Sequence, residues 1–122
     1  MTTQEFSKTL MTTLTQRMTE RLIELAEASI DAGVEEYIEK GYITLDFKGE
    51  FDSSTDLNEA DKMRQDLLTK GLGYYEFRCI SDTSWGQMRN HLEKSGWKVE
   101  WLKVDGNDQR IVKMPSKLID EQ

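Results

Sequence analysis

A long apolar stripe near the start of the chain is the feature that most constrains its fold. Large apolar side chains recur there at every fourth residue, and a second series recurs at every seventh. The first series is Phe6, Leu10, Leu14, Met18 and Leu22, and the second is Met11, Met18 and Leu25. This spacing gathers them on one side of an α-helix. We therefore predict one helix over residues 3–31, capped by Thr2 or Thr3. Gly33 bends or ends it, and a short helical piece carrying Val34, Tyr37 and Ile38 then ends at Gly41.

The length of this helix predicts a contact with another chain. A helix of about 28 residues is about 42 Å long, because each residue adds about 1.5 Å. A small sheet cannot cover that length, and an uncovered apolar stripe usually marks an interface. We expect a protein partner or a homodimer to contact Phe6, Leu10, Met11, Leu14, Met18, Leu22 and Leu25. The alternative is a helix that breaks earlier and folds back on its own core.

The rest of the chain reads as alternating strands and helices. We expect strands at residues 42–47, 74–80, 97–104 and 109–114, the last two joined by a turn at 105–108. Helices begin at the capping box Asp56–Glu59 and at Ser81 or Asp82, and they end at Gly71 and Gly96. The predicted fold class is α+β: a long N-terminal helix, then β-α-β-α-β-β, with a mixed four-stranded sheet covered by helices on one face. We expect one structural domain with three segments. Residues 1–41 form the helical segment, residues 42–115 form the β-α-β-α-β-β part, and residues 116–122 form a flexible tail.

The predicted order of elements over residues 42–114 resembles a known small fold. The C-terminal domain of translation initiation factor three, the Alba chromatin proteins and the small sulfur-carrier proteins share that order. The resemblance implies a topology and not an activity, because no diagnostic motif accompanies it. The sulfur carriers have an adjacent cysteine and proline, whereas Cys79 and Pro115 lie far apart here.

Composition excludes several classes of protein. With one cysteine and one histidine, the chain has neither an internal disulfide nor a site built from several cysteines or histidines. No apolar run approaches the roughly 18 residues of a membrane span, and no signal-peptide pattern opens the chain. We expect a cytoplasmic protein with no membrane contact, no metal and no cofactor.

The net charge of −7 is concentrated in one region. Residues 24–61 hold twelve acidic and two basic side chains. This acidic surface favours a basic partner and would speed the encounter with it. Its helical members are Glu24, Glu27, Asp31, Glu35, Glu36 and Glu39. A plain solvated face that keeps the protein soluble is the alternative.

Basic and aromatic residues alternate near the C-terminus. Indole rings can stack on bases, and the cations between them can bind phosphates, so a single-stranded nucleic-acid binder is one alternative function. The residues of that site would be Trp97, Lys98, Trp101, Lys103, Arg110 and Lys113. The competing interpretation places Trp97, Val99 and Trp101 on one buried strand face. The acidity of the chain disfavours the nucleic-acid alternative.

Three catalytic interpretations are weaker. Carboxylates after the first strand could hold a divalent cation in a metal-dependent hydrolase, and they are Asp46, Glu50 and Asp52. A second set would join Asp46 to Glu76 and Arg78 on a neighbouring strand. A third would pair the Cys79 thiol with His91, although a cysteine beside Tyr75 and Phe77 on one strand face is typical of packing.

We therefore predict a non-catalytic protein–protein interaction module that uses its N-terminal helix. One version is a carboxylate-rich decoy that occupies the nucleic-acid site of another protein. Small acidic chains of this composition resemble accessory or inhibitor proteins of bacteriophages.

Overall fold

The fold is built around one long N-terminal helix. In a computed structural model of the chain, residues 1–47 and 64–115 are described. Helix α1 spans Thr3–Asp31, and Thr2 caps it by accepting a hydrogen bond from the Glu5 amide at 3.1 Å. Helix α2, Val34–Lys40, follows and ends at Gly41, whose φ of 80° is the left-handed conformation that glycine tolerates. The predicted bounds of both helices are confirmed.

Helix α4, Tyr74–Lys94, corrects the prediction of a strand at 74–80. The short run of alternating aromatic residues suggested a strand, but the buried positions follow helical spacing over a longer window. They are Phe77, Ile80, Ser81, Ser84, Trp85, Met88 and Leu92. The Gly73 amide donates to the Glu76 carboxylate at 3.1 Å, so Gly73 caps the helix, which begins at Tyr74 and not at Ser81 or Asp82. Helix α4 ends at Lys94, and Gly96, which was predicted to terminate it, has a φ of 96°.

The sheet has three antiparallel strands in the described residues. They are β1 (Ile43–Thr44), β2 (Lys98–Val104) and β3 (Asn107–Lys113), in the order β1-β3-β2. Strands β2 and β3 form the predicted hairpin, but its turn is shorter than the predicted 105–108, because Asn107 and Asp108 pair with Val104 and Lys103. The two turn residues, Asp105 and Gly106, both have positive φ as a type I′ turn requires. The predicted mixed four-stranded sheet is wrong, because residues 74–80 are helical and leave no parallel crossover. The topology that suggested the resemblance to the initiation-factor fold is therefore not observed.

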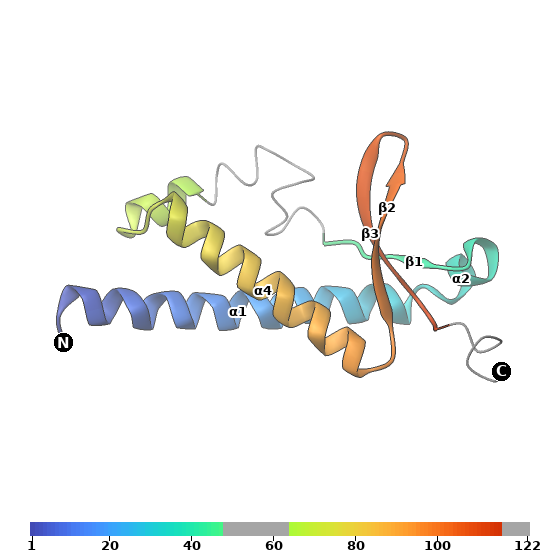
Figure 1. Cartoon of the computed structure of the whole chain (residues 1–122), viewed down its shortest axis with the longest axis horizontal. Helices are drawn as coiled ribbons and strands as arrows, with labels where there is room; N and C mark the ends of the chain where they lie inside the picture. Colours follow the sequence, from blue (N-terminus) through green and yellow to red (C-terminus); the bar gives the residue numbers. More distant parts are fainter. Residues whose placement is uncertain (48–63, 116–122) are drawn as a thin grey trace.

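Helices α1 and α4 cross, and the sheet stands beside the second half of α1 (Figure 1). The largest fully buried apolar side chains come from both helices and from β3, and they are Leu22, Ile80, Met88, Leu92 and Val112. The alternation predicted over residues 42–47 is confirmed as burial, since Ile43, Leu45 and Phe47 all face the core. Only two of these residues belong to a strand, and the Leu45 amide extends the contact by donating to the Arg110 carbonyl at 2.9 Å.

Residues 64–69 are helical and pack near the start of α4. They end at Gly71 with two hydrogen bonds, from the Gly71 amide to the Leu68 carbonyl and from the Leu72 amide to the Leu67 carbonyl. This is the Schellman arrangement, which brings the residue after the glycine back over the last helical turn. The predicted helix end is confirmed. The predicted capping box at Asp56–Glu59 and the tail at 116–122 lie outside the described residues.

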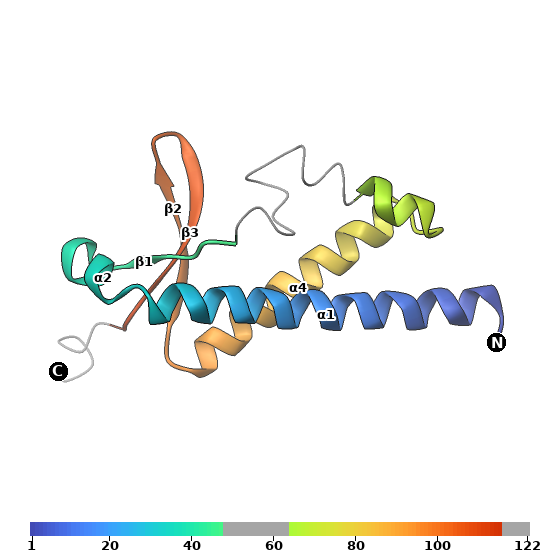
Figure 2. The same ribbon diagram turned by 180° about the vertical axis from the view of Figure 1, so that it is seen from behind.

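No helix in the described part of the chain is long and apolar enough to cross a bilayer. Seen from behind, α1 runs the length of the molecule, with α2 at one end and its own first turns at the other (Figure 2).

Candidate functional site

The two halves of α1 differ sharply in exposure. The buried residues of the helix all lie in its second half, and they are Met18, Thr19, Leu22, Leu25 and Ala26. In the first half Phe6 is 58% exposed. Leu10, Met11 and Leu14 are half-buried against the edge of the core. The apolar stripe therefore continues beyond the part of α1 that the other described residues cover.

Polar contacts join α1 to α4 from the middle of α1 toward its C-terminal end. The Ser84 hydroxyl contacts the Thr15 carbonyl at 3.2 Å, and the Thr19 hydroxyl lies 2.8 Å from the Gln87 side-chain oxygen. Farther along, His91 Nε2 lies 2.8 Å from Glu27 Oε1. From this crossing α1 and α4 diverge toward the N-terminal end of α1 (Figures 1 and 2). Their divergence leaves the start of α1 facing residues 64–72.

Two adjoining hollows occupy the space between α1 and residues 64–72. One has a volume of about 440 Å³ and is lined by Phe6, Leu10 and Leu72, among others. The other has a volume of about 260 Å³, and its lining residues are Leu14, Arg17, Met18, Asp66, Leu67, Lys70 and Ile80. Lys70 lines both hollows. We call them together the N-terminal groove, defined by Phe6, Leu10, Leu14, Arg17, Met18, Leu67, Lys70, Leu72 and Ile80.

The groove has an apolar floor and charged edges. Four side chains at every fourth residue of α1 form one wall, and the helix end at Leu67 and Leu72 forms the other. Arg17 and Lys70 supply positive charge, and Lys70 is paired with Asp66. Grooves of this kind receive the apolar face of an amphipathic helix.

The structure divides the predicted contact residues into three sets. Phe6, Leu10 and Leu14 line the groove, with Met18 at its floor at 4% exposure. Leu22 and Leu25 lie in the chain's own core, where another chain cannot reach them. Met11 lies on the other side of α1, in a more polar hollow shared with Cys79. Sequence reasoning missed the opposite wall, because only the fold brings residues 64–72 beside α1.

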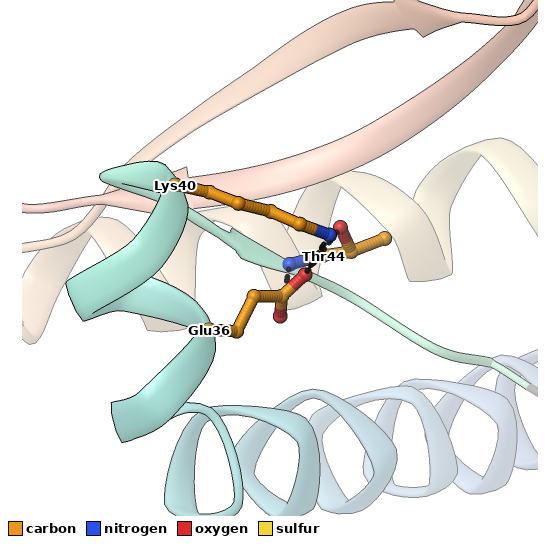
Figure 3. A network of polar contacts seen from close by, with 3 residues as sticks. All are labelled: Glu36, Lys40 and Thr44. Atoms are coloured by element: carbon orange, nitrogen blue, oxygen red, sulfur yellow. Dashed lines mark hydrogen bonds and ion pairs between the residues drawn. The ribbon is translucent and has the colours of Figure 1, made fainter.

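Three of the predicted acidic surface residues are engaged within the chain. Glu24 pairs with Arg21 at 3.2 Å, and Glu27 contacts His91. Glu36 accepts hydrogen bonds from the Thr44 amide at 3.1 Å and hydroxyl at 3.0 Å, and from Lys40 Nζ at 3.3 Å (Figure 3).

These contacts fix the charge state of Glu36. Burial opposes its ionisation, but the hydrogen bonds from Thr44 and Lys40 outweigh burial and lower the pKa of Glu36 below its ordinary value of 4.5. The carboxylate thereby ties α2 to β1. The other three acids, Asp31, Glu35 and Glu39, are exposed.

The hairpin carries a stack of rings around one guanidinium. Arg110 lies between Trp85 and Trp101, with its Cζ 3.7 Å and 4.1 Å from the two ring centroids. Trp85 in turn meets Phe47 edge-on at 4.5 Å. The stack attaches the hairpin to α4, since Trp85 belongs to the helix.

The expectation that Trp97, Val99 and Trp101 share one buried face is only partly right. Val99 is buried and Trp97 half-buried, whereas Trp101 is 50% exposed. Trp101 packs on the Arg110 guanidinium at the outside of the stack, so its alternation with Val99 does not bury it. Among the predicted cations, Lys98 and Lys103 are exposed and Lys113 pairs with Glu100 at 2.9 Å.

The described residues do not assemble the catalytic sites considered from the sequence. No group of three or more His, Cys, Asp or Glu side chains within residues 1–47 and 64–115 is placed to hold a metal ion. Asp46 is exposed, and Glu50 and Asp52 lie outside the described residues.

The predicted Cys79–His91 pair and the predicted strand position of Glu76 and Arg78 are both wrong. Cys79 and His91 both belong to α4, where twelve residues separate them by about 18 Å at about 1.5 Å per residue. Glu76 and Arg78 are likewise on this helix and not on a strand, and Glu76 caps it.

Comparison of the chain with protein-family models, with curated proteins and with solved structures gives no match.

Proposed function

We propose that this chain is a non-catalytic protein-interaction module whose N-terminal groove receives the apolar face of a partner helix. The observation that carries the proposal is the exposure of Phe6 beside a ready-made apolar hollow. Burial of a fully exposed phenylalanine stabilises by about 1.5–3 kcal/mol, and Phe6 retains 58% of its exposure, so it can contribute part of that amount as an anchor.

The charges at the groove select the partner. Arg17, Lys70 and Asp66 line it, with Asp66 paired to Lys70, so one positive charge is in excess. Acidic side chains beside the apolar face of the partner helix would therefore be favoured over basic ones. The partner is accordingly an amphipathic helix with an apolar stripe and acidic flanks.

Two synthetic helical peptides with the same apolar stripe test this proposal. One carries glutamates beside the stripe and the other carries lysines, and binding to the full chain is measured by fluorescence anisotropy. We expect the acidic peptide to bind and Phe6→Asp to abolish its binding, while Ala28→Asp, on an exposed part of the same helix, leaves it unchanged. Absence of binding, or binding that Phe6→Asp does not weaken, would refute the proposal.

A second candidate function is the binding of single-stranded nucleic acid to the hairpin. It is favoured by the exposure of Trp101, which leaves ring surface available beside Lys103. Titration with mixed-sequence oligonucleotides should then quench tryptophan emission, and Trp101→Ala should remove the quenching. Unchanged emission in the wild-type chain would exclude this function.

A further inference from the structure

Helix α2 presents a second apolar surface that is exposed in the described part of the chain. Val34 is 63% exposed and Ile38 is 75% exposed, and they lie one helical turn apart. Glu35 and Glu39 lie beside them and are also exposed. The outer face of α2 is therefore an apolar pair flanked by two carboxylates.

The inner face of α2 is held firmly against the body of the protein. Tyr37 accepts a hydrogen bond from the Met114 amide at 2.9 Å through its hydroxyl. Glu36 binds Thr44 on β1 through two hydrogen bonds. These contacts orient Val34 and Ile38 outward before any partner arrives, which lowers the entropy cost of docking.

The two ends of the molecule are complementary in charge. Residues 31–46, around α2, hold five acidic side chains and one basic one. At the other end, residues 1–17 and 64–78 together hold five basic and three acidic side chains. The N-terminal groove belongs to this basic end.

We propose that the occupant of the N-terminal groove is α2 of a second copy of this chain. Val34 and Ile38 of one copy would enter the hollow beside Phe6, and Glu35 and Glu39 would face Arg17 and Lys70. This inference rests on the proposed function and names its partner.

The placement of the two surfaces determines the kind of assembly. The groove and α2 lie at opposite ends of α1 (Figures 1 and 2), so no chain can fill its own groove with its own α2. The contact joins unlike surfaces and leaves a free groove and a free α2 at the two ends of each assembly. Such heterologous contacts extend into head-to-tail series. A groove-to-groove dimer is disfavoured, because it would oppose the same cations.

A mixing experiment with the full chain tests the head-to-tail contact. Sedimentation velocity is measured for wild type, for Phe6→Asp, which disables the groove, and for Ile38→Asp, which disables α2. Both positions are exposed, so the variants should keep the circular dichroism of wild type. Ala28→Asp, exposed on α1, is the matched control.

We expect wild type and Ala28→Asp to form a ladder of oligomers that lengthens with concentration up to the millimolar range. Each disabled variant alone should be monomeric. An equimolar mixture of the two should stop at a dimer, because it contains one intact groove and one intact α2 per pair.

Other outcomes overturn the inference in ways that separate it from the proposed function. Oligomers that persist in Ile38→Asp would show that α2 is not the occupant. A monomeric wild type that still binds the acidic peptide would reject self-docking and leave the groove as a site for another protein. A wild type that neither oligomerises nor binds the peptide would reject both proposals.

Discussion

The two halves of α1 share one periodicity and have opposite surroundings. From Met18 to Ala26 the apolar side of the helix is enclosed by α4 and the sheet, and Leu22 is fully buried. From Phe6 to Leu14 the same kind of side chain lines a groove or faces solvent. An apolar stripe thus predicts which side of a helix avoids water, but not how much of it the chain itself covers.

Length explains the difference between the halves. A helix of 29 residues is about 43 Å long at about 1.5 Å per residue, and the crossing with α4 covers only part of that length. Thr9 and Thr12 in the first half bond their hydroxyls to carbonyls four residues earlier, which satisfies these polar groups within the helix itself. The first half of α1 is therefore helical although its side chains make only partial tertiary contacts.

The sharpest test of this contrast is Leu22→Ala. The side chain is fully buried, so its removal leaves a cavity and should lower the free energy of unfolding by about 3 kcal/mol. Urea denaturation followed by circular dichroism measures the loss. Leu68→Ala, at a position that is 49% exposed, is the control and should cost far less. Equal losses would mean that the core is not where the structure places it.

Gly33→Ala probes the tight contact at the covered end of α1. A Cβ at Gly33 would lie 2.7 Å from Ile43 Cγ2, so the substitution should cost about 2 kcal/mol by overpacking. Gly86→Ala is a matched control within α4, where a Cβ meets nothing within 4 Å. It should stabilise the helix by up to about 1 kcal/mol, because alanine is the better helix former. Thermal denaturation of both variants gives the comparison, and a neutral Gly33→Ala would contradict the packing.

Glu36→Gln removes the carboxylate that ties α2 to β1 and should cost about 1 kcal/mol at neutral pH. The cost should depend on pH. Because the pKa of Glu36 is lowered on folding, its stabilisation is present above the ordinary value of 4.5 and is lost as the pH falls through the folded value.

Thermal midpoints measured from neutral to acidic pH test this dependence. The gap between wild type and Glu36→Gln should close on acidification, whereas Glu35→Gln, at an exposed position, should show little gap at any pH. A gap that persists at low pH would rule out the carboxylate as its source.

The smallest expected effect belongs to Phe6→Ala. Phe6 is 58% exposed in the single chain, so its truncation should change the free energy of unfolding by less than about 0.5 kcal/mol under monomeric conditions. Urea denaturation at low protein concentration measures it. A loss close to that of Leu22→Ala would show that the first half of α1 is covered after all, and the contrast would disappear.

Much of the helical part could be predicted from local patterns. The bounds of α1, its Thr2 cap and the end of α2 at Gly41 depend on residues close together in sequence, so the sequence signals sufficed. The β2–β3 hairpin was predictable for the same reason, because the turn residues Asp105 and Gly106 tolerate positive φ and separate two strands of suitable composition.

The start of α4 shows where local patterns mislead. Tyr74, Tyr75 and Phe77 favour a strand by residue type, yet Tyr74 and Tyr75 are exposed and Phe77 begins a helical stripe. The capping contact between Gly73 and Glu76 favours one continuous helix, and so does the absence of glycine and proline from Tyr74 to Trp85. The error added a strand to the predicted sheet, and the parallel topology depended on that strand.

The candidate site was predictable on one side only. Phe6, Leu10 and Leu14 follow from the helical stripe, but the opposing wall at Leu67 and Leu72 depends on where residues 64–72 meet α1. The burial of Leu22 and Leu25 likewise depends on α4. Sequence periodicity therefore predicts the apolar side of α1, and the tertiary structure determines which residues pack against that side.

The stack of Arg110 between Trp85 and Trp101 has a consequence for the response of the protein to ionic strength. Added salt screens exposed ion pairs such as Arg89 with Glu93, but it screens a guanidinium enclosed between two rings much less. The hairpin should therefore stay attached to α4 in concentrated salt, where pairs of opposite charge on the helix surfaces contribute little.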